Sequence, residues 1–269
     1  MSGQHQSLPK FLEDKRQLAD GESFQFTCHP GVPCFNHCCA DVNIVLTPLD
    51  VLQLARQTGL HTQVFLDTYT RNPITKDLQL PMVMLKMLDD DDDKKCPFVG
   101  EQGCTVYENR PWACRMYPLG MALPPARAGV EPEPIYFVFE DDHCKGREQS
   151  DARGWTAESW RTDQNLIERD EIESGFRDLV GHPWFIGGRQ LDPKRMHMLY
   201  TACYYLDTFR DFVFESSFLE RFELDDDVVA EIKTNDLALL KFAFLWLRFA
   251  LFREPTVKVR EGAAERSVQ

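Results

Sequence analysis

The sequence predicts a mainly α-helical protein with a few short β-strands: a cysteine-rich, metal-stapled and irregular N-terminal domain, followed by a C-terminal helical domain. Three observations lead to this fold class. Eight of the nine cysteines come before residue 145, in stretches that proline and glycine interrupt. The second half of the chain instead repeats apolar residues at helical spacing. The shares of apolar residues, 43%, and charged residues, 27%, are typical of a folded globular protein.

Four parts are expected along the chain. They are a flexible N-terminus over residues 1–22, a cysteine-cluster metal-binding domain over 23–150, a helical domain over 155–253 and a flexible tail over 254–269. The polar, glycine-flanked stretch 145–154 marks the boundary between the two domains. A chain of 269 residues can bury a hydrophobic core without help, so metal is not required by size alone.

The first elements surround the first cysteine cluster. A short helix can form over residues 8–18. Residues 28–39 must be an irregular loop, because the prolines and the glycine inside it exclude a helix. A helix then begins after Thr47, which can cap it with Asp50 as the capping-box acid, and Gly59 is the expected stop.

The next elements frame the second cysteine cluster. They are a helix over 62–69, a buried strand over 82–88, a hairpin-like loop between Cys96 and Cys104, a short helix that Pro111 opens and that carries Cys114, and a strand over 135–139. The five aspartates at 89–93 are expected to form a solvated turn, because five adjacent carboxylates cannot all converge on one cation.

The C-terminal part predicts three long helices, over 156–176, 193–222 and 236–252. In the middle helix, Cys203 falls in an apolar stripe of helical spacing, so we expect a buried core cysteine and not a ligand. The last helix is apolar on nearly every side but too short to cross a membrane. We therefore expect it to be buried or to cover a partner.

The net charge of −13 narrows the classes of partner. No stripe rich in Lys or Arg interrupts this negative balance, so the surface repels phosphate backbones and anionic lipid, and neither nucleic acid binding nor membrane insertion is expected. Residues 1–10 show no basic and apolar regions of an export signal, which predicts a cytoplasmic location. In that reducing compartment, clustered thiols bind metal or act in catalysis and do not form a disulfide framework.

The clustered cysteines are therefore predicted to hold metal. Four thiolates complete a zinc site and four hold an iron–sulfur cluster, so eight thiols suffice for two centres. The intervals of five, three, seven and nine residues between successive members of the clusters are unlike those of zinc fingers, and they do not choose between the metals. Because neighbouring side chains diverge, the adjacent pair of cysteines is expected to serve two centres or to leave one thiol over. The predicted ligands are Cys28, Cys34, Cys38, Cys39, Cys96, Cys104, Cys114 and Cys144.

Three histidines adjoin cysteines, and the sequence does not decide whether they take part in metal binding. His29, His37 and His143 can be ligands or donors near a metal, and can equally be half-exposed loop residues. A cysteine nucleophile with His37 or His143 as its base is a further hypothesis. Sequence proximity does not establish that pairing, and no catalytic residue is assigned.

The order of the motifs resembles one known family. Cys34 to Cys39 are followed by Ile44-Val45-Leu46-Thr47-Pro48-Leu49-Asp50, Cys96-Pro97-Phe98, Gly103-Cys104, Tyr107-Glu108-Asn109-Arg110-Pro111, Cys114-Arg115 and Tyr117-Pro118. This combination, over roughly residues 24–146, is similar to the YkgJ-type cysteine-cluster (CxxCxxCC) family, described as zinc- or iron-chelating. The resemblance implies metal binding by Cys38, Cys39, Cys96, Cys104, Cys114 and Cys144, whereas the intervals at Cys28 and Cys34 are longer than those in the family's first cluster. Flagellin lysine methylases carry a similar cluster, which implies a link to protein modification, although no glycine-rich nucleotide loop is visible here.

Two functions follow as expectations. In the first, an iron–sulfur cluster or zinc acts in electron transfer or in protein modification. In the second, zinc staples an interaction module without catalytic activity, and the aromatic-rich helices recognise a partner protein. Zinc that serves folding alone is a further competitor, because a structural zinc site is worth about 10–16 kcal/mol, more than the stability of most domains.

Overall fold

The computed structural model describes residues 12, 15–74, 80, 82–89, 92–123, 133–185 and 188–261. Its helices and short strands confirm the mainly α class. The chain divides into two compact units: a cysteine unit of Met1–Val42, Met87–Thr105 and Trp112–Ile167, and a helical unit of Asn43–Lys86, Val106–Pro111 and Glu168–Gln269. Each unit thus draws on segments that are distant in the sequence, and the domain boundaries proposed near residue 150 stay predictions. In the described ranges, no helix combines the length and the apolar character needed to cross a membrane.

The first helix of the helical unit follows the predicted capping pattern. In α1 (Pro48–Thr58), the Thr47 hydroxyl accepts the Asp50 backbone N–H at 3.1 Å, and the Asp50 carboxylate accepts the Thr47 N–H at 3.0 Å. Gly59 ends the helix in the left-handed region at φ 69°, as predicted. The next helix, α2 (Thr62–Tyr69), also has the predicted bounds.

A buried charged cluster joins α1 to α5 (Leu166–Val180) within the helical unit. Asp50, Arg169 and Glu173 are all buried, and Arg169 donates to the carboxylate of Asp50 and to the side-chain oxygen of Gln53. Burial and the charge of Asp50 raise the pKa of Glu173 to about 7, against the lowering influence of the Thr47 hydroxyl and of Arg169.

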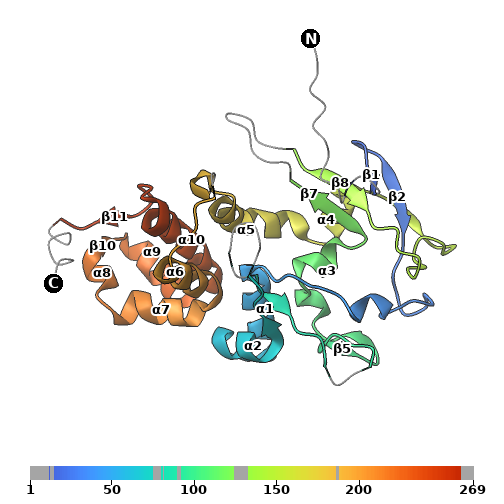
Figure 1. The fold of residues 1–269 in the computed structure, drawn as a ribbon, viewed down its shortest axis with the longest axis horizontal. Coiled ribbons are helices and arrows are strands. Elements are labelled where there is room, and N and C mark those ends of the chain that lie inside the picture. The colour runs from blue at the N-terminus through green and yellow to red at the C-terminus, as the bar shows by residue number, and fades with distance from the viewer. Residues whose placement is uncertain are drawn as a thin grey trace, which may run out of the picture. The chain divides into compact units, whose positions relative to one another are not determined.

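The C-terminal helices gather around α10 (Asp236–Phe252), which begins and ends as predicted. Figure 1 shows α6 (Pro193–Tyr204), α7 (Leu206–Glu215) and α9 (Asp226–Thr234) around it, and all three contact it. Helix α9 was not predicted from the sequence. Cys203 on α6 is 1% exposed, which confirms its predicted place in the core.

The single helix predicted over 193–222 is wrong, because the chain forms α6, α7 and a short α8 (Phe218–Arg221) instead. Ser216 ends α7: its hydroxyl donates to the Phe212 carbonyl oxygen at 2.6 Å and accepts the Phe218 N–H at 3.2 Å. The apolar pattern continues across this break, so periodicity alone did not reveal it.

The helix predicted over 156–176 is also divided. It forms α4 (Ala157–Asp163) and α5, and between them Asn165 adopts a left-handed conformation at φ 54°. A residue in that conformation interrupts a right-handed helix, and asparagine tolerates it better than most.

The first part of the tail predicted over 254–269 contains a short paired strand, and the flexibility of the tail stays a prediction. There, β11 (Lys258–Val259) pairs antiparallel with β10 (Phe222–Glu223), and Lys258 also forms an ion pair with Glu223 at 2.8 Å. Residues 262–269 lie outside the described residues.

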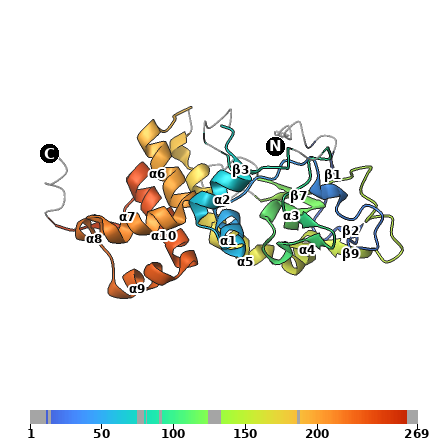
Figure 2. The same cartoon turned by 90° about the horizontal axis from the view of Figure 1, so that it is seen from below.

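Small sheets support the cysteine unit. The first is three-stranded, in the order β1 (Arg16–Gln17), β8 (Ile135–Val138), β7 (Leu119–Ala122). Figure 2 shows β2 (Ser23–Phe26) beside β9 (Arg153–Thr156), with which it pairs, and the second cysteine cluster holds the hairpin of β5 (Val99–Gly100) and β6 (Gly103–Cys104). Strand β1 replaces the described end of the helix predicted over 8–18, whose other residues lie mostly outside the described ranges.

The cysteine unit has a hydrophobic core of its own. Two indoles tie it to the backbone: the Trp155 N–H donates to the Phe26 carbonyl oxygen at 3.0 Å, and the Trp160 N–H to that of Met116 at 3.1 Å. The core consists of Phe24, Phe26, Met116, Leu119, Val138, Cys144, Trp155, Trp160 and Leu166. Burial of so much aromatic surface can order this part of the unit without metal.

Short elements complete the fold. They are the 3₁₀ turns η2 (His37–Cys39), η3 (Tyr107–Asn109) and η4 (Pro183–Phe185), the helix α3 (Trp112–Met116), and the pair of strands β3 (Thr70–Arg71) and β4 (Met84–Leu85). The strand predicted over 82–88 is therefore shorter than expected, whereas the short helix carrying Cys114 is confirmed.

Candidate metal centre

Backbone pairing joins the two cysteine clusters inside the cysteine unit. The N–H of Cys96 donates to the carbonyl oxygen of Cys39 at 2.7 Å, and Ala40 and Lys95 form an antiparallel bridge. The end of the first cluster therefore runs beside the start of the second. This pairing makes Cys39 and Cys96 neighbours although they are far apart in the sequence.

Cys38 and Cys39 form a hydrogen-bonded pair of thiols in η2. The Cys39 thiol donates to the Cys38 sulfur, which lowers the pKa of Cys38 to about 7 and raises the pKa of Cys39. Burial and the charges of Cys38, Cys114 and Cys96 raise the pKa of Cys39 further. The two side chains therefore influence each other, and the division of these thiols between centres stays a prediction.

Cys96 and Cys104 belong to the predicted hairpin, in which Cys104 pairs with Val99. Burial raises the pKa of Cys96 and so does the charge of Cys104, whereas backbone N–H groups of Phe98 and Val99 donate to the Cys96 sulfur and lower it. Backbone donors aimed at a sulfur stabilise its thiolate form. This arrangement suits a metal ligand.

The hairpin packs against the first cysteine loop at Gly103, which has φ 115°. A Cβ atom at this position would lie 3.2 Å from the ring of Phe35. Both the backbone conformation and the close approach favour glycine here. The contact holds Cys104 on the side of the first cluster.

Cys114 lies on α3, whose position is fixed by buried groups. The helix is anchored through Met116, as described above, and through Arg115, which donates to the Gln164 carbonyl oxygen at 3.0 Å. The Cys114 side chain is exposed, and its charge contributes to the raised pKa of Cys39. Cys114 therefore belongs to the same neighbourhood as the thiols of the first loop.

Five thiols thus share one region of the cysteine unit: Cys38, Cys39, Cys96, Cys104 and Cys114. Residues 27–145 match the model of a family described as CxxCxxCC, a putative zinc- or iron-chelating domain. This segment belongs to the CxxCxxCC family. The match supports metal binding as the general role of the domain. No curated protein and no solved structure matches the chain.

Two further cysteines of the CxxCxxCC domain lie close to each other in a second place. The Lys145 backbone N–H donates to the Cys34 sulfur at 3.0 Å. The preceding residue, Cys144, is 8% exposed and part of the hydrophobic core, and its thiol is hydrogen-bonded to Tyr117. Burial, followed by this contact, raises the pKa of Tyr117. Sequence reasoning missed Tyr117, which lies in one of the family motifs.

Cys28 is exposed, and its neighbour His29 is already engaged. The Nδ1 atom of His29 accepts the Gly31 N–H at 3.1 Å, so Nε2 carries the proton and donates to the Asp151 carboxylate at 2.9 Å. Both ring nitrogens are used, and His29 has no lone pair left for a metal.

The other two histidines that adjoin cysteines meet each other. The rings of His37 and His143 lie edge to face with centroids 5.8 Å apart. The fold thus joins imidazoles from two distant cysteine segments. Their part as ligands, or as bases for a cysteine nucleophile, stays a prediction.

All nine cysteines of the chain are described, and none of them forms a disulfide bond. Across the described residues, no group of three or more His, Cys, Asp or Glu side chains meets the geometry of a metal site. The CxxCxxCC domain thus presents a neighbourhood of thiols that is not closed around one point. The division of the eight predicted ligands between centres stays a prediction.

The backbone donors near the Cys96 sulfur could have been expected from the sequence. Pro97 follows Cys96 directly and has no N–H of its own, and the next two N–H groups turn toward the Cys96 sulfur. The backbone pairing of Cys39 with Cys96 had no such local signal.

Proposed function

We propose that the CxxCxxCC domain binds iron as an iron–sulfur cluster and exchanges electrons with a partner protein. Cys38, Cys39, Cys96, Cys104 and Cys114 form its principal site, and Cys28, Cys34 and Cys144 are candidates for a second centre. Four thiolates suffice for one cluster, so five thiols leave one free to donate a hydrogen bond, as Cys39 does to Cys38. A bound cluster supplies one-electron transfer at this place.

The observation that carries the proposal is the meeting of thiols from three separate segments. The charges of Cys38, Cys96 and Cys114 all act on Cys39, and Cys104 acts on Cys96. A donor set made of sulfur alone suits iron–sulfur clusters and zinc, whereas magnesium and calcium need oxygen donors. The family match supports the same two metals.

The hydrophobic core of the cysteine unit favours chemistry over a purely folding role for the metal. Phe24, Trp155 and Trp160 are buried and organise β2, β9 and α4 without any cysteine of the principal site. Metal is therefore needed at most to fix the loops. In addition, Cys38 and Cys114 are exposed, which suits electron exchange with a protein in solution.

The proposal is tested by purifying the full chain without oxygen and measuring its visible absorbance, iron, zinc and acid-labile sulfide per chain. We expect a coloured protein with iron and sulfide. Cys104→Ser and Cys114→Ser should lose both, and Cys203→Ala, which removes a thiol from the helical core, should keep both.

A colourless protein with stoichiometric zinc would favour the alternative, a zinc-stapled interaction module. Unchanged metal content and folding in Cys104→Ser and Cys114→Ser would show that the assigned ligands are wrong.

A further inference from the structure

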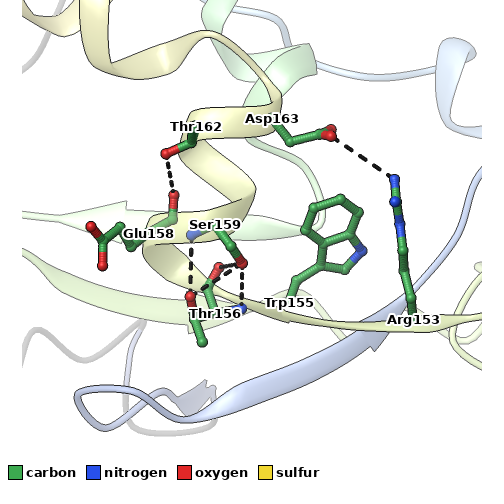
Figure 3. A pocket seen from close by; sticks show the side chains of 7 residues that line it. All are labelled: Arg153, Trp155, Thr156, Glu158, Ser159, Thr162 and Asp163. Carbon is green, nitrogen blue, oxygen red and sulfur yellow. Dashed lines mark hydrogen bonds and ion pairs between the residues drawn. The ribbon is translucent and has the colours of Figure 1, made fainter.

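A second place in the cysteine unit has the features of a binding site and contains no cysteine. It is a shallow pocket of ≈ 460 Å³ between β9 and α4, lined by side chains from residues 153–163 (Figure 3). It is therefore distinct from the thiol neighbourhood in both its chemistry and its residues.

The hydroxyl groups of the pocket are already occupied. Thr156 and Ser159 bond each other in the capping box of α4, and the Thr162 hydroxyl donates to the Glu158 carbonyl oxygen at 3.0 Å. The groups that remain for a ligand are the carboxylate of Glu158, the Oδ1 atom of Asp163 and the face of Trp155, since the Oδ2 atom of Asp163 accepts the Gln164 side-chain amide at 2.8 Å. This combination of an aromatic face and negative charge suits a cation.

Trp155 is a rigid wall of this pocket. Its indole N–H is bonded to the Phe26 carbonyl oxygen at 3.0 Å, and its ring meets Trp160 edge to face at 5.1 Å. The ring therefore does not turn to follow a ligand. The residue is 8% exposed, so what it offers a ligand is the ring face over which Arg153 lies, and that face is preformed, which lowers the cost of binding.

The chain's own Arg153 lies over that surface. Its guanidinium carbon is 4.1 Å from the centroid of the Trp155 ring, and Figure 3 shows Asp163 reaching toward the same guanidinium, at 3.9 Å. Yet the Arg153 side chain is 69% exposed, and the ion pair is at the limit of contact. Such exposed contacts contribute little, so Arg153 is a weakly held occupant.

We propose that this pocket receives the arginine side chain of a partner polypeptide, which stacks on Trp155 and pairs with Asp163 after displacing Arg153. A planar guanidinium both stacks on a ring and bonds a carboxylate sideways, which an ammonium group does less well. Glu158 adds negative charge to the rim, and the net charge of −13 attracts basic segments. Arg153 now occupies the position that the ligand's guanidinium group would take, and it has the same chemical group.

The test is a titration of the full chain with capped tripeptides whose central residue is arginine, lysine or citrulline, followed by amide and indole NMR signals of residues 153–163. Citrulline has the shape of arginine without its charge. Arg153→Gln removes the present occupant, and Asp163→Asn removes the partner of the guanidinium. Glu220→Gln makes the same charge change as Asp163→Asn at an exposed position of the helical unit.

We expect the arginine peptide to shift the Trp155 indole signal and the citrulline peptide to leave it in place. Arg153→Gln should bind the arginine peptide about fivefold more tightly and Asp163→Asn about fivefold more weakly, the sizes expected for exposed contacts. Glu220→Gln should bind like the parent chain. Equal shifts by citrulline, tighter binding of lysine, or unchanged affinity in Arg153→Gln or Asp163→Asn would overturn the proposal.

Discussion

The backbone N–H of Cys96 donates a 2.7 Å hydrogen bond to the carbonyl oxygen of Cys39. This bond does not involve either sulfur. A substitution of the thiols therefore changes the chemistry of the site while the backbone that aligns the two clusters is kept. The two residues consequently allow ligand loss to be separated from loss of structure.

We predict that Cys96→Ser loses bound metal, and that adding Cys39→Ser causes little further loss. Residues that act at one site are not additive, because the first substitution already removes the function. Metal per chain and the far-UV circular dichroism spectrum measure the two effects. Additive losses of metal would mean that the residues serve separate sites.

The pH dependence of stability should reveal Glu173. Its pKa is about 7 in the folded protein and 4.5 ordinarily, so the folded state binds the proton more tightly. The resulting stabilisation is complete below about pH 4.5 and is lost as the pH rises through 7, a difference of about 3 kcal/mol. We expect Glu173→Gln to unfold at higher urea concentration than the parent chain at pH 8 and to show a flatter pH profile.

Glu171→Gln, on the exposed side of the same helix, is the matched control for this measurement. It should leave the pH profile of the free energy of unfolding unchanged. A profile of Glu173→Gln that runs parallel to that of the parent chain would contradict the assignment.

Removing Arg169 should be costly. Arg169→Met leaves the buried carboxylates of Asp50 and Glu173 without their cation, and breaking a buried pair in this way costs about 3–5 kcal/mol. Adding Asp50→Asn should recover part of the loss, because one uncompensated charge is removed. Urea unfolding of the two variants at pH 7 measures this, and a double variant less stable than Arg169→Met would speak against it.

Gly146 should not accept a side chain. A Cβ atom there would lie 2.3 Å from the Thr27 carbonyl oxygen, and the Gly146 carbonyl in turn accepts the Thr27 N–H at 3.1 Å. The contact is between backbone atoms, so Gly146→Ala must shift the chain and should destabilise the cysteine unit by about 1–3 kcal/mol.

Gly154→Ala is the control, since its new Cβ would approach only the flexible end of Gln25, at 3.3 Å. Thermal unfolding of both variants provides the comparison. Equal melting temperatures for Gly146→Ala and the parent chain would refute the close approach.

Local patterns in the sequence predicted elements whose ends are set by neighbouring residues. Thr47, Asp50 and Gly59 bound α1 as expected, because capping depends on residues three or four positions apart. Cys203 was placed in the core because helical spacing alone puts it on an apolar stripe. The predictions of long C-terminal helices were wrong at Asn165 and Ser216. The left-handed conformation of Asn165 and the hydroxyl of Ser216 each interrupt an apolar pattern that continues beyond them.

The sequence by itself determined that this protein concentrates its thiols in two proline- and glycine-broken segments, and which family those segments belong to. It did so because residue identity and order are the family's signature. Only the tertiary structure decided that Cys39 lies beside Cys96, that the side chain of Cys39 lowers the pKa of Cys38, and that Arg153 covers Trp155. These relations depend on backbone pairing and packing between distant segments, which the spacing of residues along one segment does not encode.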